Sequence, residues 1–231
     1  GKYCGSGEAF GGLSDRRSGR ADSEKITNGK EDKIMEQMIL ASASPRRLEL
    51  LRQVGIEPVV EPSHVQEVIT STIPGEVVME LSRQKAEDIA GLHRGVPVIV
   101  LGADTVVAAD GKILGKPKDR EDAIRMVKLL QGRSHQVYTG VTLVFCGENS
   151  SQNTSPVITF FEETEVCVFP MTDRQVEAYV DTKEPMDKAG AYGIQGKFAA
   201  YVKGIVGDYN NVVGLPVGRV CQELGKRGIK F

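Results

Sequence analysis

Two adjacent arginines stand where the chemistry of a helix end disfavours them. Arg46 and Arg47 follow Ser44 and Pro45, which are residue types preferred at the N-cap and at the first helical position. Apolar residues then recur at helical spacing and predict a helix over residues 44–54: Leu48, Leu51 and Val54. A helix N-terminus attracts anions through its free N–H groups and its dipole. We therefore expect a phosphate-bearing ligand beside this turn; the alternative is a capped surface helix with two solvated arginines.

A carboxylate interrupts an almost wholly apolar segment. Residues 96–109 are nearly all apolar, as in a strand covered on both faces, except at Asp104 and Thr105. A buried carboxylate is costly unless a cation or a metal ion compensates its charge. We expect Asp104 to bind a metal ion or to activate water; the alternative is that it caps a turn at a strand end.

Two lysines are candidate partners for these charges. The Asp-Gly pair at 110–111 predicts a two-residue hairpin, and counting outward from it places Lys116 opposite Thr105 and beside Asp104. Lys85 lies within the apolar stripe of a predicted helix over 75–92. That stripe consists of Val78, Leu81, Ile89 and Leu92. Lys85 then faces a buried anion, such as a phosphate, unless its stem carries the ammonium out to water, and Lys116 is otherwise a solvated edge lysine.

Three further sites have weaker local patterns. Glu67 has the pattern of a solvated loop acid. Residues 187–196 are rich in Gly and Ala without the spacing of a Walker or dinucleotide loop, so we expect a tight loop whose backbone passes close to a ligand. His93 and His135 are isolated, and we assign neither a role.

The elements that must position these residues alternate along the chain and predict an α/β fold with a mixed sheet. We expect helices over 44–54, 75–92, 119–131 and 172–182 and from about 216, and strands over 37–42, 58–61, 97–104, 106–110, 112–115, 135–146 and 157–169. Residues 37–231 then form one domain, with two lobes around a cleft. Residues 1–36 are rich in Gly, Ser and charge, and we expect a mobile extension or, in part, sequence added to the natural chain.

Composition excludes several classes of protein. The 231 residues carry a formal net charge of −2, which argues against a nucleic-acid-binding protein that depends on a basic stripe. The four cysteines are far apart, without a zinc-like pattern, as expected of reduced structural thiols. No apolar run approaches the roughly 20 residues that cross a bilayer. We expect a protein of the cytoplasm that binds a small anion.

Several ordered motifs together resemble the Maf family of nucleoside-triphosphate pyrophosphatases, especially the branch associated with dTTP and UTP. The likeness extends from about Met38 to the carboxyl end. Its motifs are A-S-A-S-P-R-R-L-E-L-L at 41–51, L-G-A-D-T at 101–105, G-K-P at 115–117, K-A-G-A-Y-G-I-Q-G at 188–196 and V-V-G-L-P at 212–216.

The resemblance implies a fold related to the inosine-triphosphate pyrophosphatases, with an extended mixed sheet, and a homodimer. It implies hydrolysis of dTTP, UTP or related nucleotides, modified ones included, to the monophosphate and pyrophosphate with Mg²⁺ or Mn²⁺. Catalytic roles fall to Asp104, Lys85 and Glu67, and metal binding to Asp104 and Glu67. Substrate binding falls to Ser42, Arg46, Arg47, Lys116 and Gln195.

One departure from the family pattern and two alternative functions remain open. The family often carries two acids near Glu67, whereas this chain has His64 and Gln66 close to it, which puts in doubt any ligand role that needs the missing acid. The alternative function is a nucleotide-binding regulator of division or growth that does not turn its ligand over. A nucleotidyltransferase is a weaker rival, because the Gly-rich loop expected near the first strand is absent.

Overall fold

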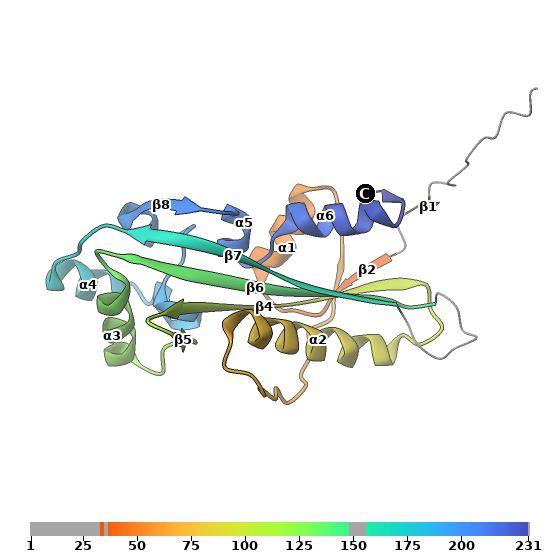
Figure 1. Ribbon diagram of the computed structural model, residues 1–231, viewed down its shortest axis with the longest axis horizontal. Coiled ribbons are helices and arrows are strands. Elements are labelled where there is room, and N and C mark those ends of the chain that lie inside the picture. The colour runs from red at the N-terminus through yellow and green to blue at the C-terminus, as the bar shows by residue number, and fades with distance from the viewer. Residues whose placement is uncertain (1–32, 35–36, 148–155, 231) are drawn as a thin grey trace, which may run out of the picture. The chain divides into compact units, whose positions relative to one another are not determined.

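The computed structural model describes residues 33–34, 37–147 and 156–230. Its strands are β1 (Lys33–Ile34), β2 (Gln37–Leu40), β3 (Val59–Val60), β4 (Val98–Ala109), β5 (Lys112–Leu114), β6 (Ser134–Phe145), β7 (Val157–Val168), β8 (Val202–Val206) and β9 (Ile229–Lys230). Seven of them form one mixed sheet in the order β3-β2-β4-β6-β7-β8, with β5 paired to β4, while β1 pairs with β9 (Figure 1).

Helices cover both faces of this sheet (Figure 1). They are α1 (Pro45–Gln53), α2 (Pro74–Leu92), α3 (Arg120–Leu130), α4 (Asp173–Val180), α5 (Tyr209–Val213) and α6 (Val217–Lys226). Three 3₁₀ turns lie between α4 and β8: η1 (Glu184–Asp187), η2 (Ala189–Ala191) and η3 (Lys197–Tyr201). The core of one face contains Leu51 of α1 and Leu224 of α6, whereas the core of the other contains Ala86 and Ile89 of α2. A third cluster packs α3 and α4 around Phe198. The expected mixed α/β sheet is thus confirmed.

Strand β4 sends neighbouring side chains to opposite faces. Leu101 and Ala103 belong to the core shared with α1 and α6, whereas Val98 and Val100 belong to the core under α2. Since side chains alternate along a strand, Asp104 falls on the α2 face and Thr105 on the α1 face.

A gap in the sheet exposes one edge of β4 at this point. The ladder between β2 and β4 ends at Leu101, and the ladder between β4 and β5 begins at Val107. Among the strands that the structure describes, residues 102–106 of β4 therefore pair on one side only, with β6. The segments after β2 and after β5 flank the gap, and they carry Ser42 and Lys116.

Two glycines allow α2 to approach the sheet closely. A Cβ on Gly102 of β4 would lie 2.3 Å from the carbonyl oxygen of Ser82 and 2.7 Å from the amide nitrogen of Ala86. A Cβ on Gly140 of β6 would lie 2.2 Å from the carbonyl oxygen of Val78. Distances this short exclude any larger residue without a shift of the helix. The close approach brings Lys85, the neighbour of Ala86, down onto the sheet.

Most predicted elements are confirmed, with three corrections. The separate strands expected over 97–104 and 106–110 are one continuous strand, because β6 pairs with all of residues 99–108. Ser44 is the N-cap residue of α1, but its side chain makes no capping bond; its amide donates to Ser42 Oγ at 3.3 Å instead. Leu92, expected in the buried stripe of α2, is 71% exposed at the last position of the helix, whereas Val78, Leu81 and Ile89 are buried.

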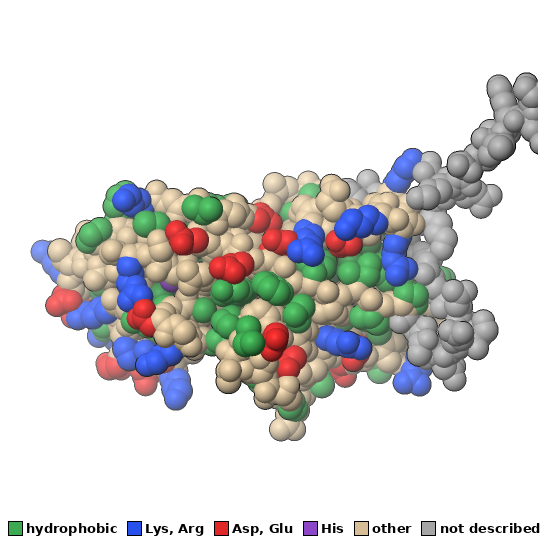
Figure 2. Space-filling model, in the orientation of Figure 1, with side chains coloured by type: hydrophobic (Ala, Val, Ile, Leu, Met, Phe, Trp, Pro, Cys, Tyr) green, Lys and Arg blue, Asp and Glu red, His purple; other side chains and the backbone are tan. Residues whose placement is uncertain are grey.

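Other expectations fall partly outside the described residues. The extension over 1–36 contributes only β1 to the described part, and Cys4 lies outside it. Among the described cysteines, Cys167 and Cys221 are free thiols. No helix of the described ranges is long and apolar enough to cross a membrane. On the face shown in Figure 2, basic and acidic side chains are interspersed over the surface.

Candidate active site

A pocket of about 1320 Å³ opens at the gap in β4. The loop after β2, the N-terminus of α1, the segment before α2, the end of β5 and the turns η1 and η2 all contribute to its wall. The structure brings all eight residues predicted for the site into this wall: Ser42, Arg46, Arg47, Glu67, Lys85, Asp104, Lys116 and Gln195. Their roles stay predictions.

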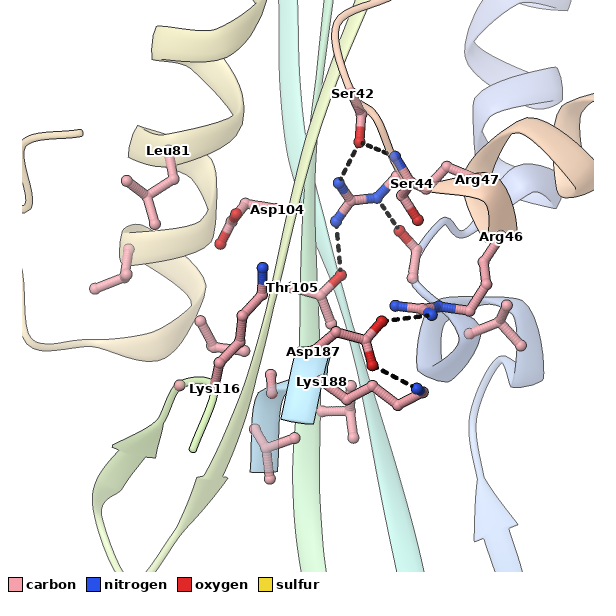
Figure 3. A pocket seen from close by; sticks show the side chains of 18 of the residues that line it. Ser42, Ser44, Arg46, Arg47, Leu81, Asp104, Thr105, Lys116, Asp187 and Lys188 are labelled. Carbon is pink, nitrogen blue, oxygen red and sulfur yellow. Dashed lines mark hydrogen bonds and ion pairs between the residues drawn. The ribbon is translucent and has the colours of Figure 1, made fainter. Parts of the chain in front are cut away.

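Arg47 is fixed by neutral oxygens from three parts of the chain (Figure 3). Its Nη1 donates to Ser42 Oγ at 3.0 Å, its Nη2 to Thr105 Oγ1 at 3.2 Å and its Nε to the carbonyl of Gly214 at 2.9 Å. Burial lowers the pKa of the Arg47 guanidinium from its ordinary value, and the charge of Asp104 opposes that shift. These three bonds position the guanidinium without neutralising it, so its charge is available to an anion in the pocket.

Lys85 lies between two carboxylates on the other side of β4. Its Nζ is 2.5 Å from Asp104 Oδ1 and 2.9 Å from Glu67 Oε1. The side chains of Lys85 and Asp104 are 18% and 16% exposed, whereas that of Glu67 is 46% exposed. Lys85 was expected to face a buried anion, and within the protein that anion is the pair of carboxylates of Asp104 and Glu67. One ammonium and two carboxylates leave the cluster with a formal charge of −1.

Arg46 lies on the same helical turn as Arg47 but has a different partner. Its Nη1 is 3.5 Å from Asp187 Oδ2, and Asp187 Oδ1 accepts a bond of 2.7 Å from Lys188 Nζ (Figure 3). The anion expected beside the arginines is thus, for Arg46, a carboxylate of the chain.

Lys116 and Gln195 are exposed side chains on the pocket wall. Lys116 follows β5 by two residues, and the register of Ala109 with Lys112 and of Val107 with Leu114 is the one expected from the hairpin. The ladder ends before it reaches Thr105 and Lys116, but Figure 3 shows the Lys116 side chain reaching toward Asp104. Gln195 lies in the tight loop before η3, where the backbone was expected to pass close to a ligand.

The two histidines that received no role have structural partners. His93 Nε2 lies 2.8 Å from Glu61 Oε2 at the end of α2. His135 is fully buried, and its Nε2 lies 2.8 Å from the hydroxyl of Tyr192. Burial lowers the pKa of His135 to about 4. Neither ring contacts the residues predicted for catalysis.

The two carboxylates suit a divalent cation whose coordination shell is completed by oxygens of the bound substrate and by water. Asp104 and Glu67 both contact one ammonium, so a single cation can reach oxygens of both. Within the described ranges no group of three or more His, Cys, Asp or Glu side chains is placed to hold a metal ion. Mg²⁺ commonly uses one or two carboxylates together with substrate phosphates and water. The residues thus fit a substrate-assisted metal site and not an all-protein cage.

Sequence reasoning missed three contributors to the site. Asp187 and Lys188 begin the Gly- and Ala-rich segment 187–196, in which only Gln195 was assigned, and an acidic residue next to a basic one at its start was the available signal. Gly214 lies in the motif at 212–216, but nothing in that motif indicated that its carbonyl binds Arg47, which is 167 positions away.

Comparison with known proteins agrees with the motifs. A family model described as "Maf-like protein" matches residues 37–227. The "dTTP/UTP pyrophosphatase" of Agathobacter rectalis is 52% identical over 206 residues, covering 84% of this chain and 99% of that protein. The "dTTP/UTP pyrophosphatase" of Carboxydothermus hydrogenoformans is 48% identical, covering 83% and 99%. Among solved structures, the Staphylococcus aureus Ham1 protein has a TM-score of 0.39 and 13% identity over 58% of this chain and 72% of that one.

Proposed function

This chain belongs to the Maf-like protein family, and we propose that it hydrolyses nucleoside triphosphates, dTTP and UTP foremost, to the monophosphate and pyrophosphate. The proposed preference for thymine and uracil nucleotides rests on the names of relatives that are 52% and 48% identical to this chain, each matched over 99% of its length. The choice of reaction is supported by the site.

The charge of the pocket carries this proposal. Six cationic side chains line it against three carboxylates, an excess of three positive charges in a chain whose net charge is −2. The cations are Arg46, Arg47, Lys85, Lys112, Lys116 and Lys188, and the carboxylates are Glu67, Asp104 and Asp187. A triphosphate and its pyrophosphate leaving group carry several negative charges, and hydrolysis depends on fixed positive groups that stabilise them.

In this proposal the residues on the two faces of β4 have different roles in the reaction. On the α1 side, Arg47 holds the phosphate chain, because its guanidinium is fixed before the substrate arrives. On the α2 side, Lys85 orients Asp104, whose carboxylate takes the proton of the attacking water. Water adds to the α-phosphorus, the bond to the β-phosphate oxygen breaks, and pyrophosphate leaves among the cations.

We also propose that Asp104 and Glu67 hold Mg²⁺ or Mn²⁺ together with substrate oxygens. Such an ion supplies positive charge that polarises the phosphoryl group and neutralises the leaving group. The negative charge of the cluster around Lys85 favours its binding. A homodimer in the cytoplasm, implied by the family resemblance, stays a prediction that sedimentation and cell fractionation can test.

A nucleotide panel tests the proposal directly. Pyrophosphate release is measured for dTTP, UTP and the other common triphosphates, with Mg²⁺ and with EDTA. We expect dTTP and UTP to be hydrolysed with Mg²⁺, EDTA to abolish release, and Asp104→Asn to reduce the rate by about two orders of magnitude or more.

The matched control is Asp173→Asn, which removes an equal charge from an exposed ion pair with Lys128 outside the pocket wall. It should leave the rate unchanged. Triphosphate binding by calorimetry without any turnover would contradict hydrolysis and favour the nucleotide-binding regulator. Unchanged turnover in Asp104→Asn would remove Asp104 from the chemistry.

A further inference from the structure

The pocket contains a carboxylate that the proposed reaction does not use. Asp187 lies at the end of η1 with its two oxygens directed to different cations, Oδ1 to Lys188 and Oδ2 to Arg46 (Figure 3). All three side chains line the pocket. Arg and Lys side chains bind the oxygens of a phosphate group in the same way as they bind the two oxygens of this carboxylate.

Of the two cations, Lys188 is held in place by more than this carboxylate. Lys188 is only 16% exposed, and its Nζ also donates to the carbonyl of Glu184 at 2.7 Å. Its stem packs over Gly193, where a Cβ would lie 2.7 Å from Lys188 Cε. Arg46 emerges from the first turn of α1, next to the fixed Arg47. Lys188 therefore keeps its position when the carboxylate leaves, and the backbone of Arg46 is fixed in the first turn of α1.

Asp187, in contrast, is free to leave. Its side chain is 64% exposed, and its ion pair with Arg46 is long, at 3.5 Å. Rotation of the carboxylate into water breaks the long contact with Arg46, which solvent screens, and the 2.7 Å contact with Lys188, whose ammonium keeps its bond to the carbonyl of Glu184.

We infer that Asp187 is an internal competitor of the substrate, whose carboxylate occupies a phosphate subsite formed by Arg46 and Lys188. A phosphate group of the incoming nucleotide, or of the pyrophosphate product, displaces the Asp187 carboxylate and binds to both Arg46 and Lys188. Lys188 is then a further substrate-binding residue. This inference rests on the proposed function, because it assigns the subsite to the phosphate chain of that substrate.

The inference has a consequence for product release. Pyrophosphate held by several cations leaves slowly unless another anion takes its place. Asp187 is that anion, tethered beside the subsite at all times. It weakens the hold on substrate and product alike, and it repels ligands that bring too little charge to displace it.

Calorimetric titration with inorganic pyrophosphate in the presence of EDTA tests the subsite without turnover. Asp187→Asn removes the competing charge and nearly preserves the shape, so we expect it to tighten pyrophosphate binding about fivefold. Lys188→Met removes a charged donor and should weaken binding about tenfold. Gly193→Ala, which displaces the lysine stem and keeps its charge, should weaken binding in the same direction. Asp173→Asn is the charge-matched control and should leave the affinity unchanged.

Two outcomes overturn the inference. Weaker binding in Asp187→Asn would show that the carboxylate positions the cations for the ligand, and unchanged binding would show that it does not occupy the subsite. Failure of the proposed function has a different appearance: no nucleotide is hydrolysed, while the effect of Asp187→Asn on pyrophosphate affinity persists.

Discussion

Substitution of Gly102 by alanine tests whether the close approach of α2 to the sheet sets the active site. Gly102 lies two residues before Asp104 on the same face of β4. The new Cβ would meet the backbone of Ser82 and Ala86, which flank Lys85 in the helix. Backbone atoms cannot rotate away as a side-chain end can, so the helix itself must move.

The size of that movement follows from the distances. An added Cβ 2.3 Å from the Ser82 carbonyl oxygen needs about 1 Å more to reach ordinary contact. The same retreat lengthens the 2.5 Å contact of Lys85 with Asp104 beyond hydrogen-bonding distance. Misplacement of a reacting group by about 1 Å can reduce a rate on the order of 100-fold. Overpacking lowers the free energy of unfolding by about 1–3 kcal/mol, which leaves a typical domain folded.

We therefore expect Gly102→Ala to lower kcat for dTTP about 100-fold while KM changes little, because in the proposed mechanism Arg47 holds the phosphates from the opposite face. Pyrophosphate release gives both constants, and urea denaturation gives the stability. Gly91→Ala is the matched control: Gly91 lies in the same helix, and a Cβ there meets nothing within 4 Å. It should keep full activity. A Gly102→Ala enzyme with kcat within twofold of the parent would refute the link between helix approach and catalysis.

Two further predictions concern charge. Lys85→Met leaves the carboxylates of Asp104 and Glu67 side by side without their shared ammonium, so kcat should fall at least tenfold. Because the two carboxylates then attract a cation more strongly, the Mg²⁺ concentration that gives half-maximal activity should fall. A higher concentration would contradict a cation site at these acids. For stability, burial and the charge of Arg133 lower the pKa of His135 from 6.5 to about 4. The unfolded chain thus takes up this proton first, and the free energy of unfolding should fall as pH drops from about 6.5 to about 4, by at most about 1.4 kcal/mol per pH unit. Urea titrations should show a shallower dependence in His135→Gln, and equal slopes would exclude His135 as its source.

Local patterns in the sequence predicted much of the fold. The periodicity of α2 and the hairpin at 110–111 depend on neighbours in the chain, and both are confirmed. Lys85 was recognised because a charge within an apolar stripe violates the local pattern. Its partner Asp104 was recognised in the same way within an apolar strand.

What the sequence could not provide is pairing over long distances in the chain. Nothing near Glu67 indicates that Lys85 lies beside it, because the segment between Glu67 and the start of α2 has neither helical nor strand periodicity. Asp187 meets Arg46 across 141 positions, and only the folded sheet brings them together. The gap along β4 depends on where β2 stops and β5 starts, which is a property of three strands at once.

The two acids at that gap, Asp104 and Glu67, lie on backbone segments of unequal stability. Asp104 sits on a strand bonded along its length to β6, whereas the backbone around Glu67 is held by side chains of α2: Gln84 binds both polar groups of Val68, and Glu80 accepts from the amide of Thr70. Amide hydrogens on the strand should therefore exchange only on global unfolding, and those at residues 65–71 through local opening. On this expectation, Asp104 keeps its place for as long as the protein stays folded, while Glu67 moves away and returns within that interval. The rate at which the second acid is recruited can then change without any loss of overall stability.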